Sequence, residues 1–130
     1  MSDEQQVALL CRSIREWNRW RAENPQMTPD LAGAGLRGVN LSGANLAGAN
    51  LKDADLRGTV LSGCMLMGAE FAAANFFKAV LDGADVDRAN LSAADLRGVA
   101  GLSHRQVDAA VCDRHTKLPD GFRDRGLDVG

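Results

Sequence analysis

Two groups of carboxylates are spaced closely enough to suggest acid–base catalysis. Asp82, Asp85 and Asp87 fall within six consecutive positions, and Asp53 stands two residues before Asp55. Two carboxylates act as general acid and general base only where their environments differ, one desolvated and the other solvated. All five fall at outward positions of the repeat described below, on a convex surface without a cleft. We therefore interpret them as solvated surface charges, and we predict that the chain is not an enzyme.

A glycine pattern typical of dinucleotide sites is also present. Gly33, Gly35 and Gly38 spell G-x-G-x-x-G, but that fingerprint requires a strand before it and a helix after it. Here the glycines belong to a five-residue repeat, so we predict no nucleotide cofactor.

Cysteine and histidine, which bind metals or act as nucleophiles, are few. The cysteines are Cys11, Cys64 and Cys112, and the histidines are His104 and His115. Their spacing matches no C-x-x-C pattern and suggests no Cys–His pair. We predict no metal site, and three unpaired thiols suit a reducing compartment. Because Cys64 takes an inward position usually held by Ala, we expect it to be an unreactive core residue.

The overall composition favours a single small, soluble unit. The chain has 130 residues, a formal net charge of −2 and 5% aromatic residues, with no Tyr. A nearly neutral chain produces no strong field for nucleic acid or anionic lipid. No apolar run approaches the length of a signal-peptide core or a membrane span. We expect a cytoplasmic protein that contacts neither a membrane nor nucleic acid directly.

An apolar residue returns at every fifth position through the middle of the chain. The fourteen residues are Leu31, Leu36, Leu41, Leu46, Leu51, Leu56, Leu61, Leu66, Phe71, Phe76, Leu81, Val86, Leu91 and Leu96. A small residue stands two positions before each, and because strand residues two apart share a side, both point into a core. Gly often stands two positions after, where the chain can bend. A chain that bends once every five residues in the same sense forms stacked coils, a solenoid.

The units "ANLAG", "ADLRG" and "ANLSA" resemble the A-(D/N)-L-x-x pattern of the pentapeptide-repeat proteins, over residues 29–98. The resemblance implies an all-β solenoid, a right-handed quadrilateral β-helix with four units per coil. Fourteen units would make about three and a half coils, with paired strands about 4.8 Å apart. The Asn or Asp of the pattern is replaced in four units, by Val60, Met65, Glu70 and Val80.

Both flanks of the repeat are expected to form helical caps over the open ends of the solenoid. The predicted parts are an amphipathic capping helix in 1–25, the β-helix in 26–102, and a short capping helix with a tail in 103–130. Ser2 and Gln5 read as a capping box, and Asn24 precedes the proline that ends the first helix. Ser103 and Gln106 form a second capping box. The apolar stripe of the first helix is Val7, Leu10, Ile14 and Trp17.

With four units per coil, residues twenty apart lie above one another. Arg37, Arg57 and Arg97 share a column that Phe77 interrupts, and beside it run Asp55, Asn75 and Asp95. We interpret these columns as a soluble face on which opposite charges satisfy each other. The alternative is an anion or nucleic-acid groove, which three arginines support weakly because they neutralise few phosphates.

The replaced positions predict an apolar contact surface. Val60 and Val80 stack on one face, Met65 and Met67 flank Leu66 on the next, and all four side chains should point outward. We expect them to form one patch with Phe77 at its edge, and such a patch indicates a partner. Two alternatives stay open: a terminal segment covers the patch, or a second copy or another protein binds it.

The sequence therefore favours a non-catalytic binding or scaffold module, a rigid rod whose partner is another protein or itself. The resemblance supplies an alternative, because some pentapeptide-repeat proteins imitate duplex DNA and bind DNA gyrase, protecting it from quinolones or inhibiting it. A DNA mimic needs a long rod with dense negative charge. Residues 29–98 hold eight acidic and six basic side chains, a net charge of −2, so we rank the module first.

Overall fold

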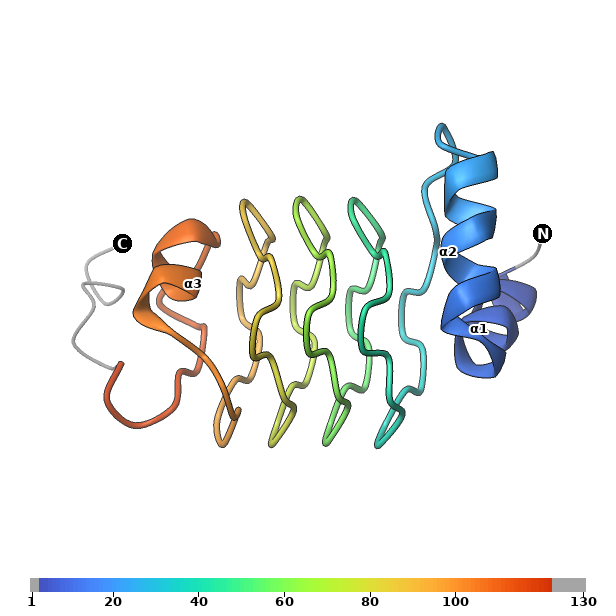
Figure 1. The fold of residues 1–130 in the computed structure, drawn as a ribbon. Helices are drawn as coiled ribbons and strands as arrows, with labels where there is room; N and C mark the ends of the chain where they lie inside the picture. The colour runs from blue at the N-terminus through green and yellow to red at the C-terminus, as the bar shows by residue number, and fades with distance from the viewer. Residues whose placement is uncertain (1–2, 123–130) are drawn as a thin grey trace.

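The computed structural model describes residues 3–122 as a rod of stacked coils with helices at both ends (Figure 1). The helices are α1 (Asp3–Arg12), α2 (Ile14–Glu23) and α3 (His104–Ala109). Between them, isolated parallel β-bridges join residues twenty apart, from Asp30–Asn50 to Val80–Ala100. Because the chain bends every five residues, no straight segment in the described part is long enough to form more than a bridge.

Each bend lies where the glycines of the repeat predict it. In the first unit the amide N of Ala34 donates to the carbonyl O of Leu31 over 3.0 Å, and Gly33 between them has a φ of +68°. A turn of this kind requires a left-handed residue at its third position. The same amide-to-carbonyl bond recurs in all fourteen units. Five units place a residue other than Gly there, at φ between 58° and 62°: Asp53, Ala73, Lys78, Arg88 and Ala93.

The apolar centres of the units form one narrow core along the rod. All fourteen are at most 4% exposed, as the repeat predicts. Two inward positions hold polar atoms, and both are satisfied: Thr59 Oγ1 donates to the carbonyl O of Leu36 over 2.7 Å, and Cys64 Sγ lies 3.0 Å from that of Leu41. Burial raises the pKa of the Cys64 thiol, so this cysteine is protonated and unreactive at neutral pH.

The N-terminal segment forms two helices, so the prediction of a single helix within 1–25 is wrong. The break occurs at Ser13, whose side chain accepts a hydrogen bond from the amide N of Glu16 over 3.0 Å. Serine favours this position because its hydroxyl satisfies an amide that the first helical turn leaves unpaired. The change of direction allows Leu10 of α1 and Trp17 of α2 to be buried together in the core at 1% and 0% exposure.

Three side chains of α2 bind the open edge of the first coil. Trp17 Nε1 donates to the carbonyl O of Asn45 over 2.8 Å, and Asn18 Oδ1 accepts from the amide N of Asn45 over 2.8 Å. The guanidinium of Arg21 donates to the carbonyl O of Ala47. These bonds satisfy backbone groups that an uncovered coil would expose as an unpaired edge.

Two of the other predicted helix ends are confirmed, and one lies outside the described residues. Asn24 is the C-cap of α2, and the capping box of Ser103 and Gln106 is present at the start of α3. Ser2 lies outside the described residues. After α3 the chain pairs with the coils again, at the bridges Asn90–Val111 and Asp95–Lys117. Among the described residues no helix has the length and apolar content needed to cross a membrane.

Candidate protein-contact surface

Asn and Asp dominate the outward position before each apolar centre for a structural reason. Asn40 Oδ1 accepts a hydrogen bond from the amide N of Ser42 over 3.0 Å, and eight further units make the same bond. The side chain thereby satisfies an amide that faces away from the neighbouring coils. The side chains of valine and methionine have no oxygen to accept this bond, so the units that contain Val60, Met65 and Val80 lack it.

Val80→Asn is therefore expected to leave the protein as stable as the wild type or to stabilise it by up to about 1 kcal/mol. The new side chain would accept a bond from the amide N of Asp82, in exchange for a half-buried valine. Urea unfolding measures the change. Val80→Ala is the matched control, because it removes the same apolar surface without adding an acceptor. If Val80→Asn is less stable than Val80→Ala, the bond does not form at this position.

The coils present four faces, and three of them carry the predicted contact residues. The arginine face carries Gly35, Arg37, Asp55, Arg57, Asn75, Phe77, Asp95 and Arg97. The valine face follows along the chain and carries Asn40, Ser42, Val60, Ser62, Val80 and Asp82. The methionine face comes next and carries Asn45, Ala47, Met65, Met67, Asp85 and Asp87. Because a bend separates consecutive faces, outward side chains of different faces point in different directions.

The valines lie together, but a polar column separates them from the methionines. Val60 and Val80 are bridge partners in adjacent coils, and both are half-buried. Between Val60 and Met65 along the chain, the outward residue is Ser62, whose hydroxyl donates to Asp82 Oδ1 over 2.5 Å. The two apolar pairs therefore lie on neighbouring faces with a polar column between them, where the sequence predicts one continuous patch.

Met65 and Phe77 are the more accessible of the five predicted residues, whereas Met67 is half-buried like the two valines. Met65 and Met67 lie on either side of Leu66 on the methionine face. Met65 is 37% exposed although the described parts of both terminal segments are present. Phe77 is 38% exposed on the arginine face, where Lys78 Nζ lies 5.3 Å from its ring centroid. The five predicted residues thus form three separate apolar spots on three faces of the rod.

Two of the three arginines on the arginine face pair with a carboxylate of their own unit. Arg57 Nε and Nη2 donate to the two carboxylate oxygens of Asp55 over 2.8 and 2.7 Å, and Arg97 binds Asp95 in the same fork over 2.9 and 2.7 Å. The hydrogen bond from Arg57 lowers the pKa of Asp55 to about 2, and the hydrogen bond from Arg97 also lowers that of Asp95. This arrangement supports the interpretation that opposite charges on this face satisfy each other.

Asp55 is expected to make the protein less stable as the solution is acidified. Its pKa is lower in the folded protein than the ordinary value of 3.8, so its contribution is complete above about pH 4 and is lost as the pH falls toward about 2. Asp55→Asn should therefore lose less stability between pH 5 and pH 2 than the wild type, measured by urea unfolding at each pH. Equal slopes for the two proteins would contradict the prediction.

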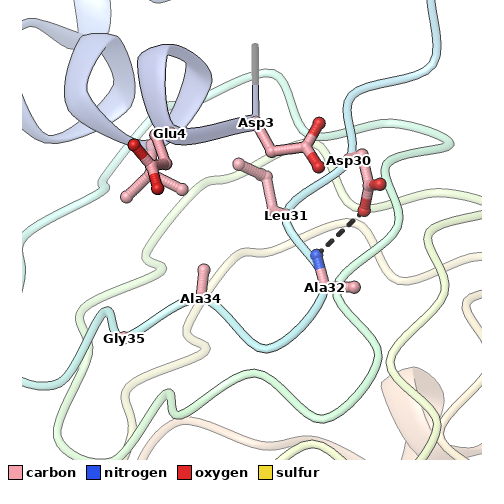
Figure 2. A pocket seen from close by; sticks show the side chains of 8 residues that line it. Asp3, Glu4, Asp30, Leu31, Ala32, Ala34 and Gly35 are labelled. Carbon is pink, nitrogen blue, oxygen red and sulfur yellow. Dashed lines mark hydrogen bonds between the residues drawn. The ribbon is translucent and has the colours of Figure 1, made fainter.

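A hollow of about 290 Å³ lies between α1 and the first coil (Figure 2). Its lining residues are Asp3, Glu4, Val7, Asp30, Leu31, Ala32, Ala34 and Gly35. Asp30 Oδ1 accepts a bond from the amide N of Ala32 over 3.2 Å. The lining contains three carboxylates and no basic side chain. Within residues 3–122, no three His, Cys, Asp or Glu side chains are grouped to hold a metal ion.

Comparison with protein-family models matches pentapeptide repeats, in eight copies, over residues 30–63 and 69–100. The chain belongs to the pentapeptide-repeat family. Its stacked coils are those of a right-handed β-helix, the fold of a solved structure of this family that it resembles. The stretch between the two matched ranges, 64–68, is the unit that contains Met65 and Met67. The family pattern is thus interrupted at one of the apolar spots.

Solved structures of other pentapeptide-repeat proteins resemble this one. Rfr23 from the cyanobacterium Cyanothece 51142 is 31% identical, with a TM-score of 0.56, over 69% of this chain and 64% of its own. The protein alr5209 from Nostoc PCC 7120 is 26% identical, with a TM-score of 0.42, over 85% of this chain and 88% of its own. QnrB1, a plasmid-mediated fluoroquinolone resistance protein, is 20% identical, with a TM-score of 0.45, over 78% and 63%. No curated protein matches the chain.

Proposed function

We propose that this pentapeptide-repeat protein is a non-catalytic binding or scaffold module whose rigid β-helix presents side chains to another protein. One observation carries the proposal: Val60, Met65 and Val80 replace the Asn or Asp that would bond the following amide. Each replacement gives up a hydrogen bond and places apolar surface outside the core. Apolar side chains gathered on the outside of a soluble protein are typical of a contact site.

The flanking helices act in this proposal as caps of a rod of about three and a half coils, in the three parts 1–25, 26–102 and 103–130. The bonds from α2 to the first coil support the N-terminal cap. At the other end, Gln106 Nε2 donates to the carbonyl oxygens of Leu81 and Ala84 over 2.8 and 3.0 Å. We place the protein in the cytoplasm, where its three free cysteines would stay reduced.

Affinity capture from a cell lysate tests the proposal with variants that follow the repeat pattern. Val60→Asn with Val80→Asn removes the valine spot, and Met65→Asn with Met67→Ser removes the methionine spot. Lys52→Ser on the fourth face is the control, because Ser stands at that position in another coil. A protein captured by the wild type and the control, but lost with one of the double variants, is the expected result. Capture that is the same for all variants would reject binding of a different protein through these spots.

The DNA-mimic alternative receives less support from the charges. Asp55 and Asp95 are engaged by Arg57 and Arg97 in the same units, so two of the carboxylates that would imitate phosphates are neutralised. A gyrase supercoiling assay with and without the protein tests this ranking. Clear inhibition, or protection from quinolones, at low micromolar protein would reverse it.

A further inference from the structure

The methionine face carries opposite charges at its two ends. At the end nearest α2, the guanidinium of Arg21 donates to the carbonyl O of Ala47. The middle coil of the face presents Met67 in the same column, and the next coil presents Asp87. From one end to the other, the column therefore runs from a cation through an apolar residue to a carboxylate.

Arg21 has no counter-charge within the described part of the chain. It makes no ion pair among residues 3–122, and its Nε is buried without a hydrogen-bond partner. Its remaining bonds go to the carbonyl oxygens of Ala47 and Met27. Burial lowers the pKa of this guanidinium, since a cation removed from water without an anion beside it is disfavoured. A carboxylate brought to this position would stabilise it.

The carboxylates at the opposite end are available. Asp85 makes no ion pair among the described residues, and Asp87 makes only a long one to Arg88, at 3.8 Å. The side chains of Asp87 and Arg88 are 59% and 85% exposed, and exposed pairs of this kind contribute little. Asp85 Oδ1 accepts a bond from the amide N of Asp87 over 3.1 Å, and its second carboxylate oxygen accepts none among the described residues.

We propose that the methionine face binds the methionine face of a second copy, with the two rods antiparallel. The two-fold axis crosses the rods at Met65 and Met67, so that each methionine meets its own counterpart. One coil to either side, about 4.8 Å away, the second copy's Asp87 lies over Ala47 and the guanidinium of Arg21. The contact is closed and self-complementary, as in most two-fold dimers. This inference deepens the proposed function and rests on it, because it names the partner of one apolar spot.

The same two-fold rotation matches the other column of the face. It places Asp85 of the second copy opposite Asn45. Asn45 Oδ1 already accepts a bond from the amide N of Ala47 over 3.2 Å, so its NH₂ group is the part left to donate. The free oxygen of Asp85 is a suitable acceptor. Both columns therefore pair a donor at one end of the rod with a carboxylate at the other.

The size of the face sets the strength of the contact. Three coils span only about 14 Å along the rod, so the buried area falls in the class below about 1,200 Å² that is typical of weak, transient complexes. The pairs at its two ends are at least partly exposed, so added salt screens them. We expect a weak dimer that forms at high protein concentration and low salt.

Sedimentation equilibrium of the full chain tests the dimer, in low and in high salt, up to about 1 mM. Met65→Asn with Met67→Ser should weaken association at least about tenfold, whereas Val60→Asn with Val80→Asn on the neighbouring face should not. Asp85→Asn with Asp87→Ser keeps the side-chain-to-amide bond of the repeat. This variant should also weaken the dimer and remove its salt dependence. Circular dichroism confirms that each variant is folded.

Crosslinking tests the register, in a background where the exposed Cys11 is replaced by Ser. With a short bismaleimide, Ala47→Cys and Asp87→Cys should each crosslink slowly when alone, because equal positions of the two copies lie two coils, about 10 Å, apart along the rods. A mixture of the two should crosslink faster, because position 47 of one copy faces position 87 of the other. The Cys11→Ser protein alone is the control for the remaining thiols.

Three results would overturn the inference. The first is a wild type that stays monomeric at every concentration, and the second is a dimer lost in the valine variant but kept in the methionine variant. The third is Ala47→Cys that crosslinks to itself as fast as to Asp87→Cys. In the first two cases the proposed function survives if lysate capture still depends on an apolar spot. If lysate capture is the same for every variant while the wild type still dimerises, binding to a different protein is rejected and the two-fold contact is retained.

Discussion

Trp17→Ala is expected to lower the free energy of unfolding by about 3–5 kcal/mol, one of the two largest losses from a single substitution. Trp17 is fully buried, and its Nε1 donates to the carbonyl O of Asn45 over 2.8 Å. Its ring also lies 5.2 Å from that of Trp20. The substitution leaves a cavity between α2 and the first coil and removes the donor that satisfies a coil-edge carbonyl. Urea unfolding followed by circular dichroism measures the loss.

Two controls separate the packing of Trp17 from its hydrogen bond. Trp17→Phe keeps most of the ring but loses the donor, and it should lose about 1–2 kcal/mol. Trp20→Ala, at a half-buried position of the same helix, should lose less than Trp17→Ala. If the two alanine variants lose equal stability, Trp17 is not the anchor of α2. Light scattering adds a second readout, since an uncovered coil edge is a template for association between chains.

The period of five was sufficient to predict the core and the bends. Each position of the unit has the same surroundings in every coil, so the residue type at that position repeats. Leu at the centre is enough to place the core, and Gly two positions later is enough to place the bends. Lys78 and Arg88 show that the period matters more than the glycine. Both adopt a positive φ, near 60°, at bend positions, where a side chain is disfavoured. The hydrogen bonds of the neighbouring coils hold these bends in place.

The break between α1 and α2 was missed although the sequence contains a signal for it. The apolar stripe continues at helical spacing from Leu10 through Ile14 to Trp17, so periodicity alone predicts one helix. Ser13 with Glu16 three residues later matches the start of a helix, and the structure uses Ser13 in this way. A capping signal inside a continuous stripe should have divided the helix.

The contact surface was predicted only in part, for a geometric reason. The expectation that residues twenty apart lie above one another correctly places Val60 beside Val80. It does not account for the second outward residue of each unit, and Ser62 therefore separates the valines from Met65. The position of Arg21 against Ala47 does not follow from the repeat period, because it depends on how α2 packs across the first coil. No spacing in the sequence reports that packing, so the charge at this end of the methionine face emerged only from the structure.

Gly101→Ala is expected to destabilise the protein by about 3 kcal/mol or more, because two penalties add. The residue has a φ of +78°, and a side chain in this left-handed region is disfavoured by about 1–2 kcal/mol. A Cβ atom here would lie 2.6 Å from the Cβ and 2.7 Å from the amide N of Asp82, and overpacking of this kind destabilises by about 1–3 kcal/mol. The backbone cannot easily move away, since Ala100 next to it bridges Val80.

Gly58→Ala is the matched control that isolates the steric part of this prediction. Gly58 has a φ of +67°, yet a Cβ atom there would have no neighbour within 4 Å, so only the backbone penalty of about 1–2 kcal/mol applies. Urea unfolding of the two variants gives the difference directly. A difference near zero would mean that the chain after the last coil shifts freely away from Asp82. A large difference would mean that the return of the chain from Ala100 to Ser103 and α3 is held against the coil beneath it, as a cap requires.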